Sequence, residues 1–274
     1  MTKRTPNLAR QTRAIDHHSP SGRPPRSVSA VAGVLSLLLL SQGAQGAIAL
    51  DRTRVIFEGG QKSISLNVTN NNKQLPYLAQ GWIEDTAGKK ITSPLVVLPP
   101  VQRLEPGKAS QVKIEALPAI NMLPNDRESL FYFNLREIPP KSDKPNTLQI
   151  ALQTRVKLFY RPKSLIPERT AAPWQEKLTL QQQGGTVIAN NPTAYYVTIV
   201  NAAANASKSS QKTDFTPVMI APFGQENLGL SVKQLGSSPV LTYINDYGGR
   251  PTLTFRCQSG ACQVNPDVKS SQAD

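Results

Sequence analysis

The chain has 274 residues, a formal net charge of +13 at neutral pH, and few aromatic residues, at 6%. Its cationic residues are scattered rather than clustered, which argues against a nucleic-acid partner. The two histidines, His17 and His18, lie in a segment that we expect to be removed, so the remaining chain lacks the residue that Ser-His and Cys-His nucleophiles and His-containing zinc sites require.

Residues 1–46 have the order of a secretory signal peptide. A basic segment is followed by the apolar run VAGVLSLLLL and then by small residues in SQGAQGA. The apolar run is too short to span a bilayer. We therefore expect cleavage after Gly46 and export of the chain from Ala47 onward.

The first part of the exported chain, residues 47–163, reads as a β-sandwich. Short alternating segments are bounded by Gly, Pro and Asn, and none has a helical period; they are KSISLNVTN, QLPYLAQGWIED, VVLPP, SQVKIEAL and LFYFNLREI. Their number and spacing are typical of an immunoglobulin-like fold.

The last segment of this part, LQIALQTRVKLFYRP, predicts a strand that is too long for its sheet. From Leu148 to Tyr160 its even positions are apolar, apart from Thr154, which is the pattern of a strand with one buried face. Thirteen residues would span roughly 43 Å, whereas an ordinary strand has about five or six. Half of this strand therefore needs a partner to cover it.

The segment RPKSLIPERTAAP, without alternation, reads as a linker to a second domain at residues 164–274. Strand-like segments continue there, as KLTLQQQ, GTVIANN, AYYVTIV, FTPVMIAP, VLTYINDYGG and PTLTFRC. We expect an all-β chain of two domains. Cys257 and Cys262 lie close together in a chain bound for an oxidising compartment, which favours a disulfide closing a hairpin over a redox pair or half of a metal site.

The sequence offers few candidates for catalytic residues. No nucleophile-elbow, zinc-protease or phosphate-loop motif is found. Two carboxylate pairs, Glu84 with Asp85 and Asp126 with Glu128, are formal candidates for acid–base work on glycosides. Neighbouring acids in loop-like sequence are usually solvated, so we expect no enzyme, no cofactor and no metal site.

Several long strings resemble the family of periplasmic pilus chaperones; they are LDRTRVIFEGG, NNNKQLPYLAQGWIED, PPVQRLEPG, LPNDRESLFYFNLREIPP, LQIALQTRVKLFYRP, NPTAYYVT and YINDYGGRPTLTF. This resemblance implies two immunoglobulin-like domains in an L shape. It further implies a periplasmic protein that binds pilus subunits and the tip adhesin, completes their fold and delivers them to an outer-membrane usher.

The resemblance also assigns roles to particular residues. Arg54 and Lys157 match the pair of cations that holds the terminal carboxylate of the subunit. Leu148, Ile150 and Leu152 match the part of the long strand that enters the core of the subunit. The surplus half of the strand would then be covered by the client.

A third group matches an ionic cluster between the domains, formed by Glu128, Arg161 and Asp246, that sets their relative orientation. The short connection KSDKPN before the long strand is similar to the short-loop branch of the family.

Two other hypotheses remain beside the chaperone. One is a secreted two-domain adhesion or structural module that self-associates through the exposed strand. The other is a hydrolase, against which the missing histidines argue. Without a client, we expect the apolar strand to be hidden by weak self-pairing in a dimer, because an unpaired apolar edge is an aggregation hazard.

Overall fold

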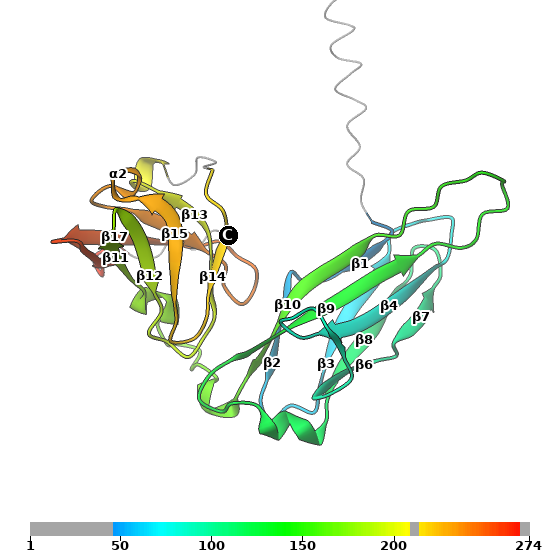
Figure 1. Ribbon diagram of the computed structural model, residues 1–274. Coiled ribbons are helices and arrows are strands. Elements are labelled where there is room, and N and C mark those ends of the chain that lie inside the picture. The colour runs from blue at the N-terminus through cyan, green and yellow to red at the C-terminus, as the bar shows by residue number, and fades with distance from the viewer. Residues whose placement is uncertain (1–45, 209–213, 269–274) are drawn as a thin grey trace, which may run out of the picture. The chain divides into compact units, whose positions relative to one another are not determined.

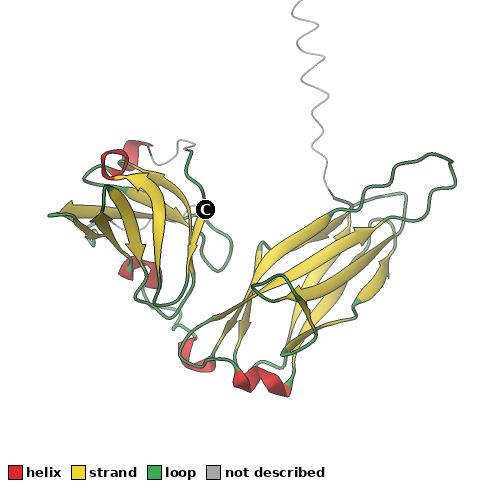
Figure 2. Ribbon diagram, viewed as in Figure 1, coloured by secondary structure: helices red, strands yellow, loops and turns green. Residues whose placement is uncertain are grey.

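The structure, a computed structural model, describes residues 46–208 and 214–268. Strands dominate, and the helices are single short turns (Figure 2). The described part of the chain holds no helix long and apolar enough to cross a membrane. The predicted signal peptide, apart from Gly46, lies outside the described residues.

Two sheets form the first domain, as Figure 1 shows. One has the order β1-β3-β8-β6 and the other β2-β10-β9-β4-β5, with β7 also paired to β4. The strands are β1 (Ile48–Leu50), β2 (Arg54–Glu58), β3 (Ser63–Asn70), β4 (Tyr77–Glu84), β5 (Lys90–Ile91), β6 (Leu95–Leu98), β7 (Val101–Leu104), β8 (Ala109–Ala116), β9 (Ser129–Ile138) and β10 (Gln153–Arg161). Two 3₁₀ turns, η1 (Pro118–Met122) and η2 (Lys163–Leu165), lie at its connections.

Alternation along the strands builds the core between these sheets. In β3, Leu66 and Val68 are fully buried while Asn67 between them is exposed. The same period buries Val112 and Ile114 in β8, because successive strand residues point to opposite faces. The expected sandwich is thus confirmed for this part of the chain.

The first strand segment of the domain is divided between the two sheets. β1 pairs antiparallel with β3, and after three residues the chain continues as β2, which pairs parallel with β10. At the other end of β2, a Cβ on Gly59 would lie 2.6 Å from the backbone nitrogen of Lys163. Glycine therefore allows β2 to pass close to the chain that leaves β10.

The expectation of one strand from Leu148 to Pro162 was wrong at its beginning. β10 starts at Gln153, and residues 148–152 have no strand conformation, although the Leu152 carbonyl accepts a bond of 3.0 Å from the Glu137 N–H. If the register that pairs Gln153 with Arg136 continued for three more residues, it would place Ile150 opposite Pro139. Proline has no N–H to donate to a ladder, so the pairing with β9 stops there.

Strands also make up the second domain, where they join in the order β14-β13-β16-β17-β18-β11-β12-β15. The elements are η3 (Trp174–Lys177), β11 (Thr179–Gln183), β12 (Thr186–Asn190), β13 (Val197–Ala203), η4 (Ala206–Lys208), β14 (Val218–Ile220), β15 (Gln225–Ser231), α2 (Val232–Leu235), β16 (Val240–Tyr243), β17 (Thr252–Gln258) and β18 (Ala261–Val264). β17 pairs with β16 through residues 252–254 and with β18 through residues 255–258, so this one strand links the two sides of the sandwich.

This domain has a hydrophobic core of its own, separate from that of the first domain and centred on residues such as Leu180, Ile199 and Phe255. The predicted disulfide is confirmed, because Cys257 and Cys262 are joined and lie directly opposite each other on β17 and β18. It closes the hairpin at one end of the core, where Cys262 is buried.

Candidate functional site: an open sheet edge beside two adjacent cations

The feature that sets β10 apart is an open edge. β9 pairs with all of β10 except its last residue on one side, from Gln153 to Tyr160. On the other side β2 pairs only with residues 157–161. Among the described residues, no strand pairs with residues 153–156 on that side, so their backbone groups are free to accept a further strand.

The apolar face of β10 continues past the end of the strand. Val156 and Leu158 are buried in the core of the first domain, and Tyr160 packs against it. Continuing the same alternation leads to three exposed apolar side chains, Leu148 at 86%, Ile150 at 66% and Leu152 at 43%. The protein thus presents large apolar side chains to solvent directly beside the open edge.

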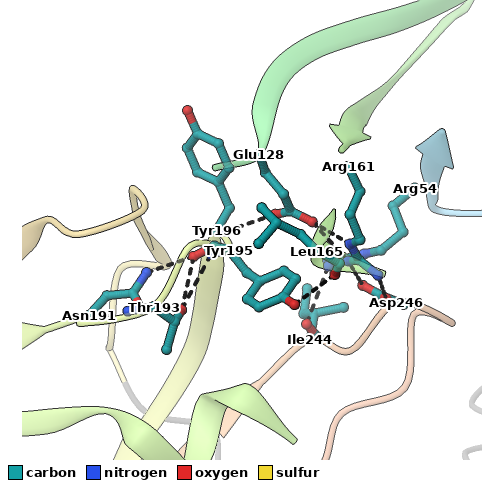
Figure 3. A network of polar contacts seen from close by, with 10 residues as sticks. All are labelled: Arg54, Glu128, Arg161, Leu165, Asn191, Thr193, Tyr195, Tyr196, Ile244 and Asp246. Carbon is teal, nitrogen blue, oxygen red and sulfur yellow. Dashed lines mark hydrogen bonds and ion pairs between the residues drawn. The ribbon is translucent and has the colours of Figure 1, made fainter. Parts of the chain in front are cut away.

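The two cations that the resemblance selected are neighbours in the structure. Arg54 begins β2, and its Cα is the register partner of Lys157 in β10. The Arg54 side chain donates a 3.2 Å hydrogen bond to the carbonyl of Ile244, and the Lys157 ammonium donates one of 3.2 Å to the hydroxyl of Thr198. Figure 3 shows Arg54 beside Ile244, close to the ionic cluster.

Neither cation is neutralised by a carboxylate among the described residues, where both make hydrogen bonds only to neutral acceptors. Arg54 is 9% exposed, and its buried Nε has no hydrogen-bond partner in the described part of the chain. Burial lowers the pKa of Arg54, and burial together with the charge of Arg54 lowers the pKa of Lys157. Two half-desolvated, adjacent positive charges create a site that favours an anion.

The third predicted group is also brought together. Arg161, at the end of β10, is 2% exposed and forms an ion pair of 2.8 Å with Glu128 and one of 2.7 Å with Asp246 (Figure 3). Its contact with Asp246 is bidentate, with a second bond of 3.0 Å. Burial opposes the charge of Arg161, but the bonds and charges of both carboxylates outweigh it, so the pKa of Arg161 is raised.

Glu128 connects this cluster to the backbone of the second domain. Its second oxygen accepts a 2.8 Å bond from the N–H of Tyr196, and its own N–H donates to the carbonyl of Ala194 at 2.9 Å. Burial raises the pKa of Glu128, and the neighbouring Arg161 offsets this only in part. Separating Glu128 from Arg161 would leave an uncompensated buried charge, which is strongly destabilising. The ion pair therefore holds the two residues together.

Aromatic residues that the sequence did not single out complete the cluster. The guanidinium of Arg161 lies over the rings of Trp174 and Tyr195, at 4.9 and 5.2 Å, and these two rings stack on each other at 4.3 Å. The Tyr195 hydroxyl donates to the carbonyl of Leu165 in the linker (Figure 3). The pair of tyrosines after Asn191-Pro192 could have pointed to Tyr195 in the sequence. No sequence pattern indicates that the carbonyl of Ile244 contacts Arg54.

The carboxylates considered for catalysis are engaged in other contacts. Glu84 pairs with Arg155, Asp126 pairs with Arg127, and Asp85 accepts backbone bonds within its own turn. The residues that the structure describes include no group of His, Cys, Asp and Glu side chains suited to a metal ion.

Two β-sandwich domains, joined through a buried ionic cluster and carrying an open apolar edge beside an anion site, define a class of strand-binding protein. Two family models match this chain, "Pili and flagellar-assembly chaperone, PapD N-terminal domain" at residues 47–166 and "Pili assembly chaperone PapD, C-terminal domain" at residues 173–255. The chain belongs to this family of pilus-assembly chaperones.

Curated relatives agree. The chain is 52% identical over 243 residues to the probable fimbrial chaperone YfcS of Escherichia coli K12, covering 87% of this chain and 96% of the relative. It is 49% identical over 232 residues to the chaperone protein PapD of Escherichia coli, covering 84% and 95%.

Solved structures share the fold. The periplasmic chaperone SfaE matches with a TM-score of 0.61 and 33% identity, covering 76% of this chain and 98% of SfaE. The CupB2 chaperone of Pseudomonas aeruginosa matches with a TM-score of 0.59 and 30% identity, covering 77% and all of that chain.

Proposed function

We propose that this chain captures pilus subunits, the tip adhesin included, by lending them the apolar edge of β10. Its family makes it a periplasmic chaperone of pilus subunits. The observation that supports strand donation is the continuation of a buried face into Leu148, Ile150 and Leu152, which stand exposed beside an open edge.

Strand addition explains how the exposed segment becomes ordered. A subunit that lacks one strand has an apolar groove and an unpaired edge of its own. Residues 148–156 supply backbone hydrogen bonds to that edge and apolar side chains to the groove. Burial of the three exposed side chains contributes roughly 1.5 to 3 kcal/mol each, before the cost of association.

Arg54 and Lys157 set the register of the added strand. β2 covers the edge from Lys157 onward, so the open part lies on the N-terminal side of this residue. A subunit strand whose terminal carboxylate binds the two cations, and which covers the open part, must therefore run parallel to β10. A slip of one residue would turn the apolar side chains away from the subunit core, and the charge-assisted contact prevents this slip.

Arg161, Glu128 and Asp246 hold the two domains in the orientation that capture requires. The chain acts without catalysis, and it delivers its subunits to an outer-membrane usher. In the absence of a subunit, a second copy covers the same edge.

The test is co-purification from the periplasm of the native strain, with mass spectrometry of the bound polypeptides. The native chain is compared with Lys157→Ala and with Lys108→Ala, a matched removal of an exposed lysine in the turn before β8. We expect a small subunit to accompany the native chain and the Lys108 variant, and to be lost from the Lys157 variant. Truncating one partner of a desolvated charged contact costs about 2 to 5 kcal/mol.

Equal recovery of the subunit by all three proteins would refute the anchor. Recovery of a second copy of the chain, with no subunit, would favour self-association through the edge in place of subunit capture.

A further inference from the structure

The sheet that contains β10 has one face turned away from the core, and several cationic side chains lie on this face beside the open edge. Register places alternate residues of β10, β9 and β4 on the face that carries Lys157, opposite the core. The members are Gln153 and Arg155 from β10, Tyr132, Asn134 and Arg136 from β9, and Trp82 and Glu84 from β4. We call this set, with Lys90 of β5, the outer face; β5 follows β4 in the sheet order, and β10, β9 and β4 lie side by side in Figure 1.

Arg155 is held in place on this face. Its guanidinium lies 3.6 Å from the centre of the Tyr132 ring, and its Nε donates to Glu84 at 3.2 Å. Its two terminal nitrogens have no hydrogen-bond partner among the residues that the structure describes. The side chain is 42% exposed, so a partner can reach it.

Arg136 and Lys90 are held in a similar way by one tryptophan. Their cationic groups lie 5.0 and 5.4 Å from the centre of the Trp82 ring, and both residues are exposed. The Arg136 guanidinium also donates to Gln153 at 3.1 Å, and Gln153 donates to Asn134 at 2.9 Å. These contacts restrict the cations before any partner arrives, which lowers the entropy cost of binding.

The outer face has a surplus of positive charge. It carries three cations, Lys90, Arg136 and Arg155, against one carboxylate, Glu84, so its net charge is 3 − 1 = +2. Lys157, two residues from Arg155 on the same strand and face, extends this positive field to the anion site. A partner that binds at the open edge of β10 lies next to this face.

We propose that the outer face is a second contact surface for pilus subunits, which recognises a carboxylate-bearing surface of the subunit and accelerates its capture. This inference rests on the proposed function. The occupant is the same subunit that receives the strand, because the face shares β10 with the open edge and has the opposite charge to such a surface. Charges at the rim of an interface act mainly on the association rate and on its salt dependence.

The experiment compares two triple variants with equal changes in net charge. One is Lys90→Gln/Arg136→Gln/Arg155→Gln, which removes the cations of the outer face. The matched control is Lys62→Gln/Lys73→Gln/Lys108→Gln, at three exposed lysines outside the outer face. Thermal unfolding is measured for both, and the single Arg155→Gln variant replaces the first triple if that variant is unstable.

The probe is the subunit that co-purifies with the native chain, kept unfolded in urea and diluted into each protein at several salt concentrations. At low salt we expect the outer-face variant to form the complex about tenfold more slowly than the native chain, with a weaker dependence on salt. The control triple should differ from the native chain by less than about twofold. Dissociation of the finished complex should change little, unlike in Lys157→Ala.

Equal association rates for the two triple variants would overturn the outer-face proposal. If Lys157→Ala still weakened the complex in that case, the proposed function would stand without it. Failure to recover any subunit with the native chain would contradict both proposals.

Discussion

The two halves of the stretch from Leu148 to Arg161 share one alternating pattern but differ in structure. The second half, β10, is paired with β9 and β2, and its apolar face is buried. In the first half, Leu148, Ile150 and Leu152 are exposed and the backbone has no strand conformation. The comparison shows that alternation specifies which side chains will share a face, while a partner strand decides whether the face forms.

Shortening one apolar side chain in each half should affect stability very differently. Leu158→Ala removes a fully buried side chain and should lower the free energy of unfolding of the first domain by about 2 to 5 kcal/mol. Ile150→Ala removes an exposed side chain and should change stability by less than about 0.5 kcal/mol. Urea unfolding of both variants measures the difference.

Subunit capture should depend on Ile150 in spite of its small contribution to stability. Ile150→Ala should therefore reduce co-purification of the subunit while the urea midpoint stays constant. A loss of stability equal to that of Leu158→Ala would mean that the first half is already packed in the free protein.

The contact that Lys157 of β10 is proposed to make with the subunit carboxylate can be tested by varying the pH. Burial lowers the pKa of Lys157 in the free chain below its ordinary value of 10.5, and a bound carboxylate would raise it again. The complex thus binds more protons than the free protein, so affinity should fall as pH rises through the pKa of the free lysine. Affinity for the subunit, measured from neutral pH to about pH 10, should decline in the native chain.

Lys157→Arg provides the control for this titration. An arginine remains charged over the whole range, so its affinity profile should be flat. An identical decline in both proteins would assign the pH dependence to other groups.

The smallest change in stability is expected from a substitution next to the start of β10. If the ladder were continued past the bond between Glu137 and Leu152, Pro139 would lie opposite Ile150 at the next hydrogen-bonded position. Pro139→Ala restores a backbone donor there, so the ladder should extend and the amide of Ile150 should exchange with solvent more slowly. One such hydrogen bond contributes about 0.5 to 1.5 kcal/mol, so global stability should change little.

Hydrogen–deuterium exchange of residues 148–152 is the measurement for this variant. Unchanged exchange would show that the missing donor is not what ends β10, and that the segment stays open for another reason.

Much of the fold followed from local sequence. Period-2 alternation predicted the two sandwiches, because a strand with one buried face repeats every two residues whatever its neighbours are. The short spacing between Cys257 and Cys262 predicted their disulfide, because a hairpin brings residues so close in sequence together. The roles of Arg54, Lys157 and the ionic cluster came from resemblance, since a charged residue in a strand carries no local sign of burial.

Tertiary structure alone decided the rest. It brought Arg54 next to Lys157, and the carbonyl of Ile244 within hydrogen-bond distance of Arg54. It also packed the rings of Trp174 and Tyr195 against Arg161. It also started β10 at Gln153, although the alternating pattern of the sequence begins at Leu148. A sequence pattern records which side chains can share a face, but pairing, burial and the meeting of distant charges depend on which strands become neighbours.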